Sequence, residues 1–164
     1  MLRPGTEHER AATATRSLFD RVAIGYSALG NNGLLWIACG VAVAVATDHV
    51  GAVVSTTAIV WATLVLNFVI KRVVRRSRPV ARGGRVPLIR PPTSPSFPSS
   101  HSAMAAAGAI ALSLDAPGLW PLFATLAIFM AASRVYLVVH HVSDVVAGLA
   151  VGACTGAALA LLVA

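Results

Sequence analysis

Charged residues are scarce in this chain of 164 residues. Asp, Glu, Lys and Arg together make up 12% of it, whereas 57% is hydrophobic and the mean hydropathy is +0.77. A soluble domain carries about 25% charged residues, so this composition excludes a soluble globular protein. Residues 1–164 are predicted to form a single integral-membrane domain, long enough for about five transmembrane helices.

Cysteine is also rare, and no cleavable signal peptide is evident. Cys39 and Cys154 both lie in apolar runs, which argues against a disulfide framework or a thiolate metal site. The first 21 residues are polar and mixed in charge, so we expect the start of the chain to be retained. The net charge of +7 favours contact with a membrane surface and an anionic substrate. Because the basic residues are not interleaved with aromatic ones, no nucleic-acid partner is expected.

The apolar pattern predicts an all-α, polytopic membrane bundle. Residues 1–30 are expected to form an interfacial segment with an amphipathic helix from Ala11 to Leu29, and Ser17 and Asp20 fit a capping box. A role of this helix in packing is the alternative. Five spans are then expected: Leu34–Ala46, Val50–Ile70, an Ala-rich third that follows Ser102 and ends at Leu114, Leu119–Val139 and Val142–Ala164. Prolines and arginines make residues 79–98 a basic, proline-rich loop at the active site. In the last span Gly148, Gly152 and Gly156 provide a smooth surface, expected to pack inside the monomer, although a homo-oligomer stays open.

A few ionisable residues interrupt the apolar sequence, and such residues are costly in a membrane unless they have a function. Asp144 follows His140 by four residues, one helical turn, so the carboxylate is expected to fix the imidazole tautomer. An alternative is that these two residues only satisfy each other in a packed core. Because spans alternate in direction, the end of the second span, the start of the third and the junction of the fourth and fifth should meet on one side of the membrane. These three stretches contribute Lys71, Arg78, Ser99, Ser100, His101, Arg134, His140 and Asp144.

This set of residues predicts a phosphate pocket. Lys71, Arg78 and Arg134 suit a tetrahedral phosphoryl group, and the backbone N–H groups of Ser100 and His101 at a helix N-terminus would add donors. His140 is then expected to attack phosphorus, with His101 as the acid–base partner. No metal and no other cofactor is expected, because the cations already offset the developing charge. A histidine zinc site is the competing and less favoured idea.

The motifs resemble those of the phosphatidic acid phosphatase type 2 superfamily of membrane lipid phosphatases. Lys71 through Arg78-Pro79 matches the first motif, Pro98-Ser99-Ser100-His101 the second, and Ser133-Arg134, His140 and Asp144 the third. The resemblance implies that Lys71, Arg78, Ser99 and Arg134 contact phosphate, His101 is the general acid, His140 the nucleophile and Asp144 its orienting carboxylate. Ser100 stands where the second motif of the family has glycine, but it keeps its backbone N–H. The chain is also smaller than a typical member, which has six spans. His141 has no counterpart and is expected at the pocket rim.

Charge distribution predicts the orientation in the membrane. Every Lys and Arg lies on the side of the proposed site, including Arg3, Arg10, Arg16 and Arg21, which places the site at the cytoplasmic face. The Ala, Val, Arg and Gly bias suggests a bacterial inner-membrane protein. With the resemblance, this favours decaprenylphosphoryl-5-phosphoribose, a cell-wall arabinan precursor, as the lipid phosphate substrate. A polyprenyl pyrophosphate or phosphatidylglycerophosphate is the alternative, and a non-catalytic lipid-binding or transport subunit is the alternative of another class.

Overall fold

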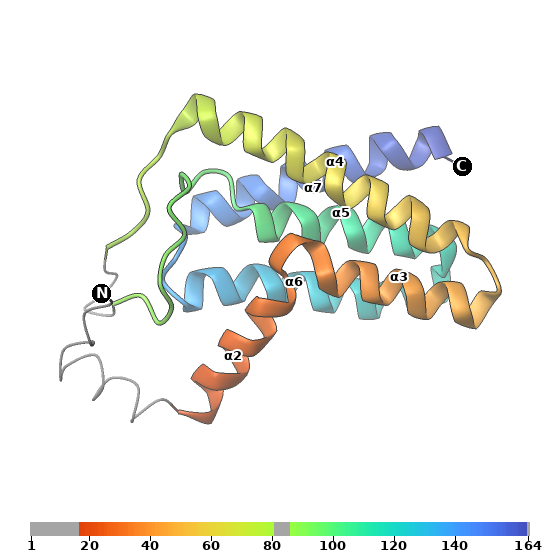
Figure 1. Ribbon diagram of the computed structural model, residues 1–164, viewed down its shortest axis with the longest axis horizontal. Helices are drawn as coiled ribbons and strands as arrows, with labels where there is room; N and C mark the ends of the chain where they lie inside the picture. The colour runs from red at the N-terminus through yellow and green to blue at the C-terminus, as the bar shows by residue number, and fades with distance from the viewer. Residues whose placement is uncertain (1–16, 81–85, 164) are drawn as a thin grey trace, which may run out of the picture.

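The computed structural model describes residues 17–80 and 86–163, and this part of the chain is helical with irregular connections and no β-strand (Figure 1). The basic residues Arg3, Arg10, Arg16, Arg82 and Arg85, and the first part of the expected interfacial segment, lie outside the described residues. The α-helices are α2 (Leu18–Leu29), α3 (Leu34–Thr47), α4 (Gly51–Val74), α5 (Ser100–Asp115), α6 (Trp120–Tyr136) and α7 (Val142–Val163). Two 3₁₀ turns, η1 (Asn31–Gly33) and η2 (Pro117–Leu119), join α2 to α3 and α5 to α6.

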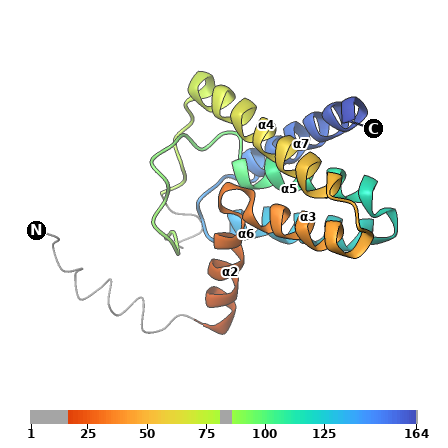
Figure 2. The ribbon, with the colours of Figure 1, turned by 45° about the vertical axis from the view of Figure 1, so that its right-hand side comes forward.

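Helix α5 is the centre of the bundle and packs against α3, α4, α6 and α7 (Figures 1 and 2). Its alanines allow this, because small side chains let neighbouring helices approach closely. The glycines of α7 face it: a Cβ at Gly148 would lie 2.5 Å from the Ser99 carbonyl oxygen, and one at Gly156 would lie 3.0 Å from the Ala107 Cα. Packing of the glycine surface inside the monomer is thereby confirmed.

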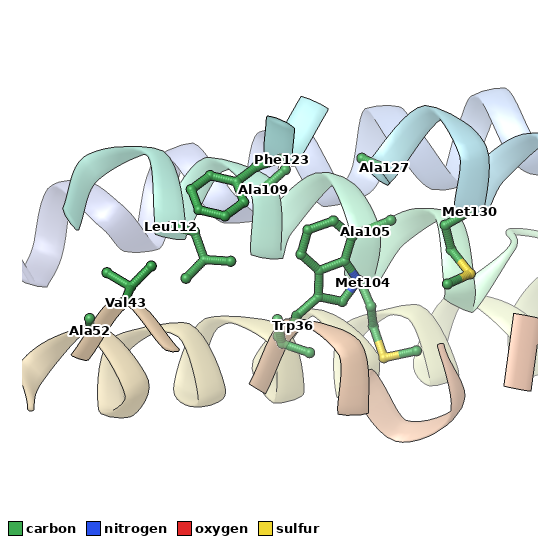
Figure 3. Close-up of a cluster of buried hydrophobic side chains, with 11 residues drawn as sticks. Trp36, Val43, Ala52, Met104, Ala105, Ala109, Leu112, Phe123, Ala127 and Met130 are labelled. Atoms are coloured by element: carbon green, nitrogen blue, oxygen red, sulfur yellow. The ribbon is translucent and has the colours of Figure 1, made fainter. Parts of the chain in front are cut away.

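A cluster of large apolar side chains fills the space between α3, α5 and α6 (Figure 3). Trp36 is fully buried against α5, where a Cβ at Gly108 would lie 2.6 Å from the indole Cγ. Met104, Leu112 and Met130 complete the same cluster. This core fixes α5 relative to α3 and α6, and so fixes the N-terminal end of α5.

The chain bends by 60° between α2 and α3. Asn32 (φ 52°) and Gly33 (φ 79°) both adopt the left-handed conformation, which ends α2 and redirects the chain. The expected capping box is present: the Ser17 side chain accepts from the Asp20 N–H, and the Asp20 carboxylate accepts from the Ser17 N–H. In both ribbon views α2 therefore leaves the direction of α3 and lies beside the end of α6 (Figures 1 and 2).

Within residues 17–80 and 86–163, three helices are long and apolar enough to cross a membrane, and the count rises to four if the bent α2–α3 pair is one span. They are α4, η2 with α6, and α7. Helix α5, with 16 residues, is shorter than a typical span of about 20 residues. An all-helical membrane protein is confirmed, whereas the count of five and an interfacial position for α2 stay predictions.

Two helix boundaries differ from those expected near the site. Helix α4 continues to Val74, four residues beyond the predicted end, and α6 ends at Tyr136 rather than Val139. The early end of α6 coincides with Val138, whose φ of 58° is rare for a β-branched residue. Residues 137–141 are consequently a non-helical connection between α6 and α7.

The close contact between α5 and α7 predicts that Gly152→Val destabilises the protein by about 1–3 kcal/mol, because a Cβ there would collide with the backbone of Ala103. Ala157→Val on the exposed side of α7 is the matched control. Thermal unfolding in detergent should show a lower Tm for Gly152→Val only, and equal values for the two variants would contradict this packing.

Candidate active site

Backbone hydrogen bonds bring the three polar stretches together at one end of the bundle. The Ser99 N–H donates to the Asp144 carbonyl oxygen at 2.9 Å, which joins the start of α5 to the first turn of α7. The Ser96 N–H donates to the Arg76 carbonyl oxygen at 2.8 Å, which ties the proline-rich loop to the segment after α4. Five of the predicted residues are buried here: Lys71, Ser99, Arg134, His140 and Asp144. The predicted convergence of the three stretches is therefore what the structure shows.

The imidazole of His140 lies between Arg78 and Asp144. Arg78 Nη1 is 3.1 Å from His140 Nε2 and also donates to the Val139 carbonyl oxygen at 2.8 Å. Arginine has only donors, so this contact is favourable only when Nε2 carries a lone pair. The proton of the neutral ring is then on Nδ1, the nitrogen that faces Asp144 Oδ2 at 3.6 Å. His140 therefore presents the tautomer required of an Nε2 nucleophile.

The expected helical turn between His140 and Asp144 is wrong. His140 lies in the connection before α7, whereas Asp144 occupies the first turn of that helix. The 3.6 Å separation is longer than a hydrogen bond, and Nδ1 has no hydrogen-bond partner among the described residues. The carboxylate faces the ring through loop geometry, which the sequence spacing does not reveal.

Asp144 is fully buried and is held by three donors that surround its carboxylate. Arg76 Nη1 donates to Oδ1 at 2.9 Å, and the His141 N–H donates to Oδ2 at 2.8 Å. The Ser96 hydroxyl makes a short hydrogen bond to Oδ2. Arg76 and Ser96 were not predicted as site residues, because neither belongs to a motif and only the folded loop brings them to Asp144.

Burial and positive neighbours hold His140 in its neutral form. Burial makes the largest contribution and, with Arg78, Arg134 and Lys71, lowers the pKa of His140 to about 2. A protonated imidazole would be penalised both by lost hydration and by repulsion from these cations. The lone pair on Nε2 is therefore available throughout the physiological pH range.

The other two cations have different surroundings. Lys71 Nζ donates to the carbonyl oxygens of Pro95 at 2.8 Å and Ser96 at 3.3 Å, so it helps to hold the loop. Arg134 is 2% exposed; it donates from Nη1 to the Ser27 hydroxyl, while its buried Nε has no hydrogen-bond partner among the described residues. A buried guanidinium with an unsatisfied N–H is suited to an anionic ligand.

The start of α5 is built as a helix N-terminus, as predicted. The Ser99 side chain caps the helix and accepts from the N–H and hydroxyl groups of Ser102. Asn67 donates to the Pro98 carbonyl oxygen and to the Ser100 hydroxyl, so it fixes this turn against α4. The N–H groups of Ser100 and His101 lie in the first turn, where backbone donors lack helical acceptors and favour an anion.

His101 contacts a part of the chain that the sequence interpretation left out of the site. Its Nε2 lies 3.2 Å from Asn31 Oδ1 in η1, and the Ser27 backbone carbonyl also hydrogen-bonds to it. A Cβ at Gly30 would lie 2.6 Å from His101 Cδ2, so only glycine allows the chain to approach this closely. Neither Asn31 nor Ser27 was predicted as a site residue, because both are neutral polar residues outside the three motifs.

A metal site does not emerge from the part of the chain that the structure describes. No group of three or more His, Cys, Asp or Glu side chains is placed there to hold a metal ion. A hollow of about 590 Å³ beside the site is lined by Arg76, Arg78 and His141 among others. This places His141 next to the site, with basic side chains around an opening suited to phosphate.

Curated relatives match about half of the chain. A decaprenylphosphoryl-5-phosphoribose phosphatase of Mycobacterium tuberculosis is 44% identical over 88 residues, which is 54% of this chain and 48% of that protein. An undecaprenyl-diphosphatase of Sulfolobus acidocaldarius is 37% identical over 100 residues, 55% of this chain and 48% of that protein. The alignments thus span about half the length of these relatives.

A solved structure is similar over most of the fold. This structure is that of a transmembrane PAP2-type phosphatidylglycerolphosphate phosphatase from Bacillus subtilis. It superposes on this chain with a TM-score of 0.70 and 27% sequence identity, and the match covers 93% of this chain and 81% of the B. subtilis chain. The family model of the PAP2 superfamily matches residues 50–164, which include all three motifs of the site. On this evidence the chain belongs to the PAP2 superfamily, a family that includes membrane lipid phosphatases.

Proposed function

We propose that the protein is an integral-membrane lipid phosphatase that hydrolyses a phosphomonoester through a phosphohistidine on His140. The observation that carries the proposal is the arrangement of His140, with Nε2 3.1 Å from Arg78 Nη1 and Nδ1 facing the buried Asp144 carboxylate. This arrangement supplies a neutral nucleophile next to a cation that can hold its target. A core histidine satisfied by an aspartate would not need Arg78 at its reactive nitrogen.

Two displacements at phosphorus complete the proposed reaction. His140 Nε2 forms a bond to phosphorus as the bond to the ester oxygen breaks, and His101, protonated beside the bound phosphate anion, donates a proton to that departing oxygen. Water then attacks the phosphohistidine, His101 takes its proton, and the P–N bond breaks to release phosphate and restore His140. Lys71, Arg78, Arg134 and the N–H groups of Ser100 and His101 stabilise charge on the phosphoryl oxygens, so the mechanism requires no metal.

The proposed substrate is decaprenylphosphoryl-5-phosphoribose. The match to the phosphatase of M. tuberculosis supports it, since that relative is 44% identical over a segment of 88 residues. The B. subtilis structure and the S. acidocaldarius relative make phosphatidylglycerophosphate and polyprenyl pyrophosphate the second candidates. The basic residues on the side of the site support a cytoplasmic orientation in the inner membrane of a bacterium. A homo-oligomer stays open.

Purified protein should release phosphate from decaprenylphosphoryl-5-phosphoribose faster than from phosphatidylglycerophosphate or undecaprenyl pyrophosphate. His101→Ala should lower kcat by about 10²–10⁴-fold because it removes the general acid. His140→Ala should abolish turnover and also the acid-labile phosphoenzyme that ³²P-labelled substrate forms, because it removes the nucleophile.

His141→Ala is the matched control, because its backbone N–H still bonds Asp144 and its side chain has no proposed role. It should retain activity close to that of the natural protein. Unchanged turnover in both His101→Ala and His140→Ala would instead support a non-catalytic lipid-binding or transport subunit.

The lowered pKa of His140 predicts that this ring stays neutral at acidic pH. Since the pKa lies at about 2, the fraction protonated at pH 4 should be about one per cent. The ring ¹⁵N chemical shifts of His140 in detergent, assigned by comparison with His140→Gln, should stay those of a neutral tautomer with the proton on Nδ1 between pH 8 and pH 4. A protonation midpoint above pH 5 would show that the cations and burial do not act as described.

The contact between Asn31 and His101 predicts a positioning role for Asn31. Asn31→Ala should lower kcat about tenfold with little change in KM, because His101 loses the acceptor that orients its ring. Asn31→Asp keeps an acceptor oxygen and should restore most of the rate. Equal kcat in Asn31→Ala and the natural protein would contradict this role, and equal losses in both variants would indicate a structural effect.

A further inference from the structure

A groove between α2 and α6 adjoins the phosphate site but contains none of its predicted residues. It has a volume of about 450 Å³ and is lined by Phe19, Val22 and Tyr26 of α2 and by Leu126, Phe129 and Ala132 of α6, among others. On both helices the lining residues recur at helical spacing, so each helix presents one continuous apolar strip to the groove.

The polar atoms in the groove wall are already bonded within the protein. The Tyr26 hydroxyl donates to the Leu126 carbonyl oxygen at 2.7 Å, and the Tyr136 hydroxyl donates to Asp20 Oδ1 at 2.7 Å. Ser133 donates to the Met130 carbonyl oxygen at 2.7 Å. The groove therefore favours an apolar occupant.

Several large apolar side chains of the groove are exposed rather than covered by the protein. Phe19 is 65% exposed, Val22 59% and Phe129 62%. The edge-to-face pair of Phe19 and Tyr136, with ring centroids 5.0 Å apart, joins the two walls near the end of α6. Aromatic and aliphatic side chains at this spacing suit a long flexible hydrocarbon.

The groove is connected to the phosphate site through both of its walls. Tyr26 precedes Ser27 on α2, and Ser133 precedes Arg134 on α6; Ser27 accepts the hydrogen bond of the Arg134 guanidinium. An occupant of the groove thus passes within one residue of a cation that we assign to phosphate. A lipid whose phosphate is held in the site can therefore place its chain in the groove, whereas a lipid without a phosphate gains no contact with these cations.

We propose that the groove between α2 and α6 binds the hydrocarbon chain of the lipid phosphate substrate while its phosphate occupies the site of His140 and Arg134. This inference rests on the proposed lipid phosphatase function and adds a substrate subsite, one wall of which, α2, lies outside residues 50–164, the segment that the family model matches. Contacts along the chain supply binding energy that can orient the phosphate for attack.

Photolabelling tests the subsite without requiring turnover. A long-chain alkyl phosphate with a diazirine in its chain, irradiated with the His140→Ala protein in nanodiscs, should label peptides that contain residues 19–26 and 126–136. An excess of the same lipid phosphate without diazirine should reduce the labelling, whereas the corresponding alcohol should not. Labelling of other peptides, or labelling that the phosphate and the alcohol reduce equally, would overturn the proposal and indicate that bulk lipid occupies the groove. Cross-links between two copies of the chain would also overturn it and indicate a dimer contact.

Substrate comparison gives a second test. Ala132→Phe fills the groove and should lower the ratio of kcat/KM for the long-chain alkyl phosphate to kcat/KM for para-nitrophenyl phosphate about tenfold. Ala62→Phe, the same change at an exposed position of α4, should leave this ratio unchanged. An equal ratio in the two variants would overturn the subsite. If the natural protein hydrolyses neither substrate, the proposed function fails, and the photolabelling still decides whether the groove binds a lipid phosphate chain.

Discussion

Positive charge enclosed around a neutral histidine is the constraint on which the site depends. Lys71, Arg78 and Arg134 lie in or beside an apolar bundle, and the Asp144 carboxylate offsets part of the positive charge of Lys71 and Arg78. Buried cations are costly unless donors find acceptors, so the proline-rich loop supplies carbonyl oxygens to Lys71 and Arg78. The same excess of positive charge lowers the pKa of His140 and favours a bound anion. The geometry that makes the site costly without a ligand therefore also favours the binding of an anion.

Sequence reasoning predicted this site because charged residues stand out in an apolar chain. Helices that alternate in direction bring the ends of α4 and α6 and the starts of α5 and α7 to one side, so topology alone places Lys71 near His140. The prediction failed where the backbone leaves regular helix. Val138, with its φ of 58°, ends the helical path before His140, and a left-handed valine cannot be anticipated from local propensity. The four-residue spacing to Asp144 was informative, but the helical turn inferred from it was wrong.

The contribution of the N-terminal helix could not be predicted for a different reason. Ser27 and Asn31 are neutral residues near a helix end, where the usual interpretation is capping or chain reversal. Their partners, Arg134 and His101, are 107 and 70 residues away in sequence. Gly30 permits the close approach, since any Cβ there would meet the His101 ring. Only the tertiary packing of α2 on α6 shows that a segment outside the family match touches both a phosphate ligand and the proposed acid.

The two parts of the chain consequently have different roles in the proposed reaction. Residues 50–164 contain every group that is proposed to touch phosphorus or its oxygens, and within this segment α5 packs against α4, α6 and α7. Ser27 of α2 and Asn31 of η1 instead contact Arg134 and His101, and α2 forms one wall of the apolar groove. Helix α2 is joined to α3 through a 60° bend and packs mainly on α6, whereas α5 packs mainly on α7. Substitutions in α2 can therefore act on the proposed chain-binding groove and, through Ser27, on Arg134.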